Sequence, residues 1–181
     1  MIIVEESCVL LAVPAQIWPL LADFNRWKEW LFVQNAGETG VGNAMKVLGG
    51  EAGAQQLGIY YDKDPKELIT QTGKVLVWNP PTHVAIALGD WNPETGRVVN
   101  GMRLPGAYGA WVGRMRALSL RLDVILEPVS VAETKMTVRF DGYFTDEFFG
   151  RFLNLFLPWG LGKTAKFFVK KFPLVLEASP R

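Results

Sequence analysis

The stretch IIVEESCVLLAVPAQIWPLLADFNRWKEW, residues 2–30, decides the fold. Its first part is a hydrophobic run of strand character that stops at Pro14, and proline is tolerated in the first turn of a helix. Ile17, Leu20 and Leu21 then follow at helical spacing. Asp23 is a typical N-cap residue for a second short helix. The stretch therefore predicts a strand followed by two short helices.

Two later segments predict long antiparallel strands. Apolar and polar residues alternate through residues 118–126 and again through residues 136–144. This period of two indicates a sheet with one buried and one solvated face, and residues 127–133 supply the hairpin loop. Further strands are predicted, with turn signals between them, at residues 57–62, 68–78 and 83–88.

The glycine-rich region 37–58 is interpreted as turns between short extended pieces, and residues 89–109 as a loop. From residue 146 to the end the pattern is helical. Pro158, Gly160 and Gly162 predict a break or kink in this helix. Beyond the break, one side is apolar and the other carries lysines: Leu161, Ala165, Phe168 and Phe172 against Lys163, Lys166 and Lys170.

Composition narrows the class of protein. A chain of 181 residues is the size of one domain, so we expect a single domain over residues 1–181. The net charge of +1 gives no reason to expect a nucleic-acid partner. The single cysteine, Cys8, suits a reducing compartment. No signal peptide or bilayer-spanning run is evident, and we therefore expect a cytoplasmic protein.

The opening stretch, with VPAQIW at residues 13–18, resembles the start of the SRPBCC superfamily, which includes START lipid-transfer domains, polyketide cyclases and birch-pollen-type allergens. In that superfamily a first strand leads through an A-P-x-x-V-W turn into two short helices. The resemblance implies an α+β helix-grip fold, in which a curved antiparallel sheet wraps around a long C-terminal helix. It also implies a cavity for an apolar ligand. The order of predicted elements matches this layout over the whole chain.

Residues suited to catalysis are scarce. His83 is the only histidine, which excludes a site with several histidine ligands, and it is interpreted as a solvent-facing residue at the start of a strand. Cys8 lies within a hydrophobic run and is interpreted as an inert buried thiol. The glycines lack the spacing of a phosphate-binding loop. We expect neither a metal nor a cofactor.

An apolar wall remains as the candidate site. If the long strands bend around the terminal helix, their inward residues and those of the helix line one space, although the same residues can equally fill a compact core. A loop at residues 101–113 is a candidate lid or entrance. The predicted ligand-binding residues are Tyr60, Met102, Tyr108, Trp111, Leu120, Leu122, Val124, Val138, Phe140, Phe152, Phe156 and Trp159.

Three functions are considered, of which we choose the first and keep the second as the alternative. The first is binding or transport of a small hydrophobic molecule of lipid, polyketide or isoprenoid type. The second is an enzyme of the polyketide cyclase or aromatase kind, which would need inward polar groups. The third is an interaction role, in which the sheet or the basic terminal helix docks on a protein or makes weak peripheral contact with a membrane. Simple packing of that helix on the sheet is the alternative to membrane contact. The polar groups available to orient a ligand are Tyr60, Asp90, Arg103, Tyr108, Arg114 and Arg116. For the second function we expect Asp90, Tyr108 or Arg116 to point into the cavity.

Overall fold

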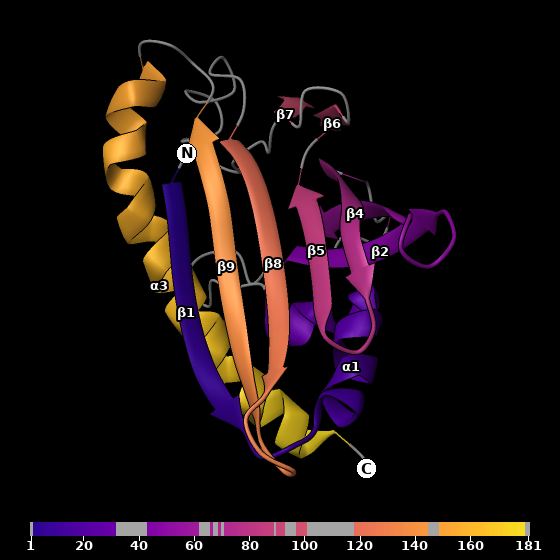
Figure 1. Cartoon of the computed structure of the whole chain (residues 1–181). Helices are drawn as coiled ribbons and strands as arrows, with labels where there is room; N and C mark the ends of the chain where they lie inside the picture. The colour runs from indigo at the N-terminus through magenta and orange to yellow at the C-terminus, as the bar shows by residue number, and fades with distance from the viewer. Residues whose placement is uncertain are drawn as a thin grey trace.

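A seven-stranded antiparallel sheet forms the centre of the protein, with the strands in the order β1-β9-β8-β5-β4-β3-β2 (Figure 1). The computed structural model describes residues 2–31, 43–61, 66, 69, 71–88, 90–92, 97–100, 118–144 and 149–179. The strands of this sheet are β1 (Ile2–Leu10), β2 (Asn43–Gly49), β3 (Gln56–Tyr61), β4 (Gln71–Asn79), β5 (His83–Leu88), β8 (Leu118–Pro128) and β9 (Thr134–Phe144). The helices are α1 (Pro14–Ala22), the 3-10 helix η1 (Phe24–Glu29) and α3 (Phe149–Ala178).

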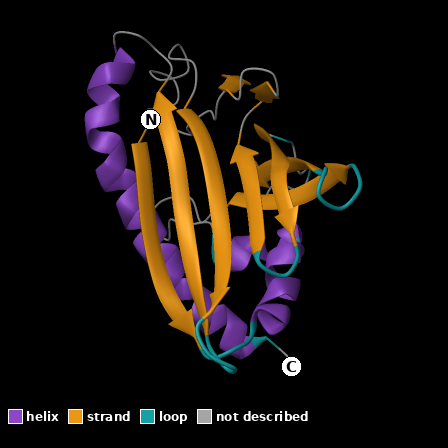
Figure 2. Cartoon of the chain, in the orientation of Figure 1, coloured by secondary structure: helices purple, strands orange, loops and turns teal. Residues whose placement is uncertain are grey.

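The sheet is curved, and the helices lie together on one side of it (Figure 2). The long helix α3 packs along β1 and β9, and η1 packs against β2. The opening stretch therefore forms the edge strand β1 and contacts the strand at the opposite edge, β2, through η1. The curved sheet with its long terminal helix matches the predicted architecture. The expected strand and two short helices are present, and the Asp23 side chain accepts a hydrogen bond from the Asn25 backbone N–H at 3.1 Å, as an N-cap should.

The β8–β9 hairpin confirms the alternation seen in the sequence. Leu122 lies opposite Phe140, and Val124 lies opposite Val138. All four side chains are buried. The two strands are each two residues longer toward the hairpin loop than predicted, because Glu127 and Pro128 still pair with Lys135 and Thr134. The long pairing fixes which side chains face α3.

The structure corrects the expected break in the terminal helix. α3 is one helix of 30 residues that contains both Pro158 and Pro173, and it curves along the sheet in Figure 1. Proline removes one backbone hydrogen bond from a helix, but packing of an apolar face on the sheet can outweigh that local cost. The apolar face continues through the position of the predicted break, from Leu157 to Leu161 and Ala165, and all three residues are buried.

Residues 89–109 are expected to form a loop, but two short strands lie within this range. The strands β6 (Asp90–Asn92) and β7 (Arg97–Asn100) pair as a short antiparallel hairpin beside the main sheet. β2 and β3 arise from the glycine-rich region, and β4 starts at Gln71 rather than at residue 68. Tight turns such as the one before β3 use glycine at positive φ, as at Gly53 with φ of 89°.

A cluster of aromatic side chains lies in the core beneath the sheet. Trp27 and Trp30 are both fully buried, with ring centroids 4.9 Å apart. Trp30 in turn packs edge-on against Phe172 of α3 at 5.0 Å. These rings join the short helices after β1 to the second half of the terminal helix, so the opening stretch anchors α3.

Candidate functional site

The concave face of the sheet presents an apolar wall to α3. Leu120, Leu122 and Val124 of β8 lie beside Val138 and Phe140 of β9, and all five are buried. They face inward as predicted, because strand residues two apart share a face. Binding of a ligand by these residues stays a prediction.

The helical side of this space differs from the expectation. Phe156 and Trp159 are 57% and 68% exposed, so they do not face the sheet. The reason is the continuity of α3: without a break, the helical period that turns Leu161 inward also turns Leu157 inward and leaves Phe156 and Trp159 on the outer side. Phe152 lies in α3, but the structure does not describe its side chain. The inward set that is observed comprises Leu157, Leu161, Ala165, Phe168 and Phe172.

The two ends of the interior are closed to different degrees. At the end where β5 finishes and β8 begins, Leu88 and Leu120 retain 5% and 6% exposure, and Leu157 of α3 retains 8%. Toward the other end, Val124 and Phe172 retain none. The first end lies at the top of Figure 1 and the second beside the β8–β9 turn. Among the described side chains, the interior is therefore slightly less enclosed at the first end than at the second.

Several predicted site residues fall elsewhere. Tyr60 lies on the opposite face of β3 from the buried Leu57 and Ile59, and Lys46 Nζ stands 5.0 Å from its ring centroid. The expectation that Tyr60 lines the interior is therefore wrong, since strand alternation turns it outward. The structure places Asp90 in β6 but does not describe its side chain. The other predicted residues lie outside the described residues: Met102, Arg103, Tyr108, Trp111, Arg114 and Arg116.

Titratable groups are few on the inner face. Among the described residues, Cys8 and Glu6 of β1 share the face of the apolar wall, since they lie opposite Met136 and Val138. Burial raises the pKa of the Cys8 thiol to about 11, so the thiol is neutral at physiological pH, as expected of an inert cysteine. Glu6 lies at the sheet edge, with its carboxylate 3.7 Å from Lys166 Nζ.

The outer face carries a charged cluster that the sequence analysis missed. His83 Nε2 lies 2.8 Å from Asp123 Oδ1, and Arg121 forms two hydrogen bonds to the same carboxylate at 2.8 and 2.7 Å. His83 is thus partly buried and paired rather than simply solvent-facing. The alternation of apolar and polar residues predicts that Asp123 faces solvent, but the residue is only 4% exposed. The β5–β8 register brings His83, Arg121 and Asp123 together. No group of three or more side chains that could hold a metal ion occurs within the described residues.

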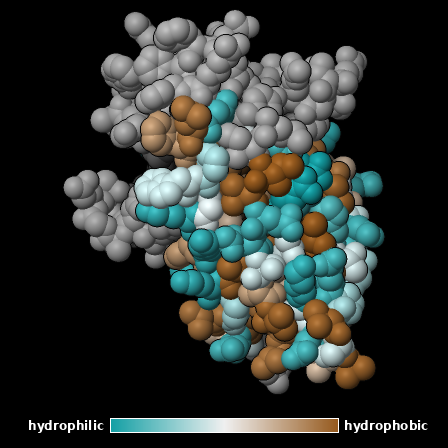
Figure 3. Space-filling model, turned by 60° about the vertical axis from the view of Figure 1, so that its left-hand side comes forward, coloured by the Kyte–Doolittle hydropathy of each residue, from teal (hydrophilic) through white to brown (hydrophobic). Residues whose placement is uncertain are grey.

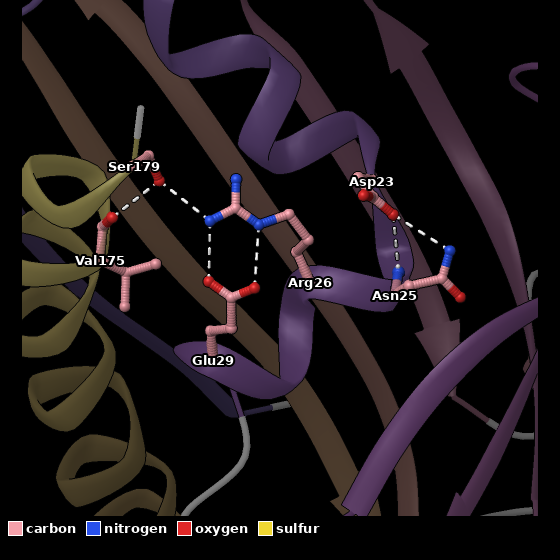
Figure 4. A network of polar contacts seen from close by, with 6 residues as sticks. All are labelled: Asp23, Asn25, Arg26, Glu29, Val175 and Ser179. Carbon is pink, nitrogen blue, oxygen red and sulfur yellow. Dashed lines mark hydrogen bonds and ion pairs between the residues drawn. The ribbon is translucent and has the colours of Figure 1, made fainter. Parts of the chain in front are cut away.

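A surface groove of about 420 Å³ lies between η1 and the second half of α3. Arg26 forms its η1 wall, where it donates two hydrogen bonds to Glu29 and a third, at 2.9 Å, to the hydroxyl of Ser179 (Figure 4). Lys170 and Lys171 line it from α3. The Arg26–Glu29 pair lowers the pKa of Glu29, chiefly through these hydrogen bonds. This network ties the end of α3 to the opening stretch.

The outer side of α3 combines apolar and basic residues. Leu155, Phe156 and Trp159 are all more than half exposed. Lys163 follows one turn later, with its Nζ 3.7 Å from the centroid of the Trp159 ring. Figure 3, which brings this side of the molecule forward, shows hydrophobic and hydrophilic residues next to one another on the surface. No helix within the described residues is long and apolar enough to cross a membrane.

Comparison with solved structures supports this architecture. The Zhui aromatase/cyclase from Streptomyces sp. R1128 superposes with a TM-score of 0.64 at 12% identity, covering 97% of this chain and 93% of that one. A START superfamily protein from Mycobacterium smegmatis gives 0.57 at 12% identity, with 97% of each chain covered. The chain has the START-like helix-grip fold.

A third match fits the same fold within a larger protein. The di-domain ARO/CYC protein BexL from the BE-7585A biosynthetic pathway gives a TM-score of 0.57 at 14% identity, covering 99% of this chain but 48% of BexL. No protein-family profile matches the sequence. No curated protein shows significant sequence similarity either. The likeness is therefore one of fold.

Proposed function

We propose that the protein binds a small hydrophobic molecule, of lipid, polyketide or isoprenoid type, between the concave face of its sheet and α3. The observation that carries the proposal is the apolar wall of β8 and β9, which faces an equally apolar side of α3. The residual exposure of Leu88, Leu120 and Leu157 supports entry of the molecule at that end of the sheet. A carrier in the cytoplasm is the role that we infer.

An enzymatic role has less support from the described residues. A cyclase needs polar groups that transfer protons or orient a reactive chain. The described inward-facing groups that titrate are a neutral thiol, Cys8, and an edge carboxylate, Glu6. An apolar lining suits binding better than catalysis.

Calorimetric titration with 2-ethylnaphthalene tests the proposal. We expect saturable binding, and we expect Leu120→Trp to weaken it by about tenfold or more, because the larger side chain occupies the inner end of the entrance. Ile125→Trp is the matched control, since Ile125 lies on the outward face of the same strand. Circular dichroism confirms folding of both variants. Equal affinity in the two variants, or no saturable binding by the natural protein, contradicts the proposal.

A second candidate function is docking on an anionic membrane surface. It is favoured by the exposed Leu155, Phe156 and Trp159, which precede the lysines Lys163, Lys166 and Lys170 on the outer side of α3. Apolar side chains that enter the headgroup region beside lysines that attract anionic lipids are the features of an interfacial helix.

Co-sedimentation with vesicles tests the docking candidate. We expect binding to vesicles that contain phosphatidylserine and little binding to pure phosphatidylcholine. Trp159→Ser should reduce binding several-fold, whereas Leu174→Ser, which removes another exposed apolar residue of α3, should not. Equal losses in both variants, or binding that does not depend on phosphatidylserine, would exclude this surface.

A further inference from the structure

Trp30 carries a buried hydrogen-bond donor that has no acceptor. Its side chain is fully buried, and no acceptor within the described residues lies within hydrogen-bonding distance of Nε1. A buried N–H without a partner is costly, and native proteins satisfy nearly all such groups with protein, water or ligand. The indole N–H of Trp30 therefore requires an explanation.

Trp27 shows that the fold can satisfy an indole in this place. It is equally buried, and its Nε1 donates to the backbone oxygen of Leu21 at 2.9 Å. The two rings are neighbours, at 4.9 Å between centroids. The lack of an acceptor is thus particular to Trp30 and is not shared by the neighbouring Trp27.

The Trp30 ring cannot turn easily to find an acceptor. It packs edge-on against Phe172 at 5.0 Å and against Phe168 at 6.2 Å, and both are inward-facing residues of α3. Its backbone N–H donates to the oxygen of Trp27 at 3.3 Å. Closely packed rings in a core hold their orientation. The ring is consequently held beside Phe168 and Phe172, two residues of the apolar side of α3 along which we assign the ligand.

We propose that the Trp30 indole N–H is the polar anchor of the ligand site, and that the ligand is an apolar molecule bearing a hydrogen-bond acceptor such as a ketone oxygen. This inference rests on the proposed function and specifies the class of ligand. An apolar pocket with one directed polar group fixes a ligand's orientation and rejects analogues that lack the matching group. Binding of a pure hydrocarbon leaves the donor unmet, whereas an acceptor-bearing molecule satisfies it.

The test compares two probes of nearly equal shape, 2-acetylnaphthalene and 2-ethylnaphthalene, which differ by a carbonyl group in place of a methylene group. The measured quantity is the ratio of their dissociation constants. We expect the preference for the ketone, expressed as this ratio, to fall about tenfold in Trp30→Phe. Trp27→Phe is the matched control, because it removes an equally buried indole whose N–H is already satisfied, and its ratio should stay that of the natural protein.

A second measurement does not depend on the variants folding. In the natural protein, the indole 15N–1H resonance of Trp30 should shift downfield with 2-acetylnaphthalene and much less with 2-ethylnaphthalene, while the Trp27 resonance responds equally to both. If neither probe binds, the proposed function itself fails. If both bind with a ratio that Trp30→Phe leaves unchanged and the Trp30 resonance does not distinguish them, Trp30 is not the anchor. An internal water or the Phe172 ring would then satisfy the donor.

Discussion

At the scale of single residues, burial in this protein lowers the reactivity of its cysteine. Cys8 lies on the inner face of β1, and burial raises the pKa of its thiol from 9.0 to about 11. The thiolate is the reactive form of cysteine. A difference of two units leaves about 100 times less thiolate at about pH 8 in the folded protein than in the unfolded chain.

Alkylation by iodoacetamide measures this difference. At about pH 8 the folded protein should react about 100-fold more slowly than the protein unfolded in urea, and restricted access can only add to the ratio. As the pH rises from 9 to 11, the folded rate should continue to rise while the unfolded rate levels off. The Cys8→Ser variant shows that no other residue reacts. Equal rates in the two states would mean that the thiol is not desolvated.

Other residues show what local patterns cannot predict. The inward facing of Leu122 and Val138 follows from alternation alone, and the structure confirms it. The partners of His83 do not follow, because Asp123 lies 40 residues away and meets it only through the β5–β8 register. The unmet indole of Trp30 is equally invisible in the sequence, which shows a tryptophan but not its acceptor.

At the scale of elements, α3 is the clearest difference between sequence and structure. Proline and glycine predict a break by their local propensities, but the apolar face of the helix is continuous and the sheet buries it. Tertiary packing outweighs propensity in such cases. The error had a direct consequence for the site, since a helical segment that ended at a break need not share the phase of Leu161 and could have turned Phe156 inward. The β strands were predicted better because their period of two repeats over many residues.

Alanine substitution tests the continuity of α3. A Cβ added at Gly160 would have no heavy atom within 4 Å, so Gly160→Ala should raise the free energy of unfolding by about 1 kcal/mol, as measured by urea denaturation. Gly53→Ala is the opposite control. It should destabilise, because Gly53 has φ of 89° and its added Cβ would lie 2.9 Å from Trp78 Cβ. A loss of stability in Gly160→Ala would show that the helix is broken there after all.

At the scale of the whole molecule, the sequence predicted the architecture better than the site. The order of strand, two short helices, antiparallel strands and long helix is local information, and the resemblance of residues 2–30 placed it in one fold. The site needs more, since it depends on how α3 is phased against the sheet and on which end stays open. The candidate site therefore keeps the predicted wall of β8 and β9 but loses Tyr60, Phe156 and Trp159 from its interior.

The binding of an apolar guest between the sheet and α3 is the central claim, and methyl NMR tests it most directly. With 13C-labelled methyl groups and 2-ethylnaphthalene added up to its solubility, the inward methyls of Leu120, Leu122, Val124 and Val138 should shift together. The exposed methyls of Ile3 and Val131 should stay in place. Shifts confined to the exposed methyls, or none at all, would contradict the claim.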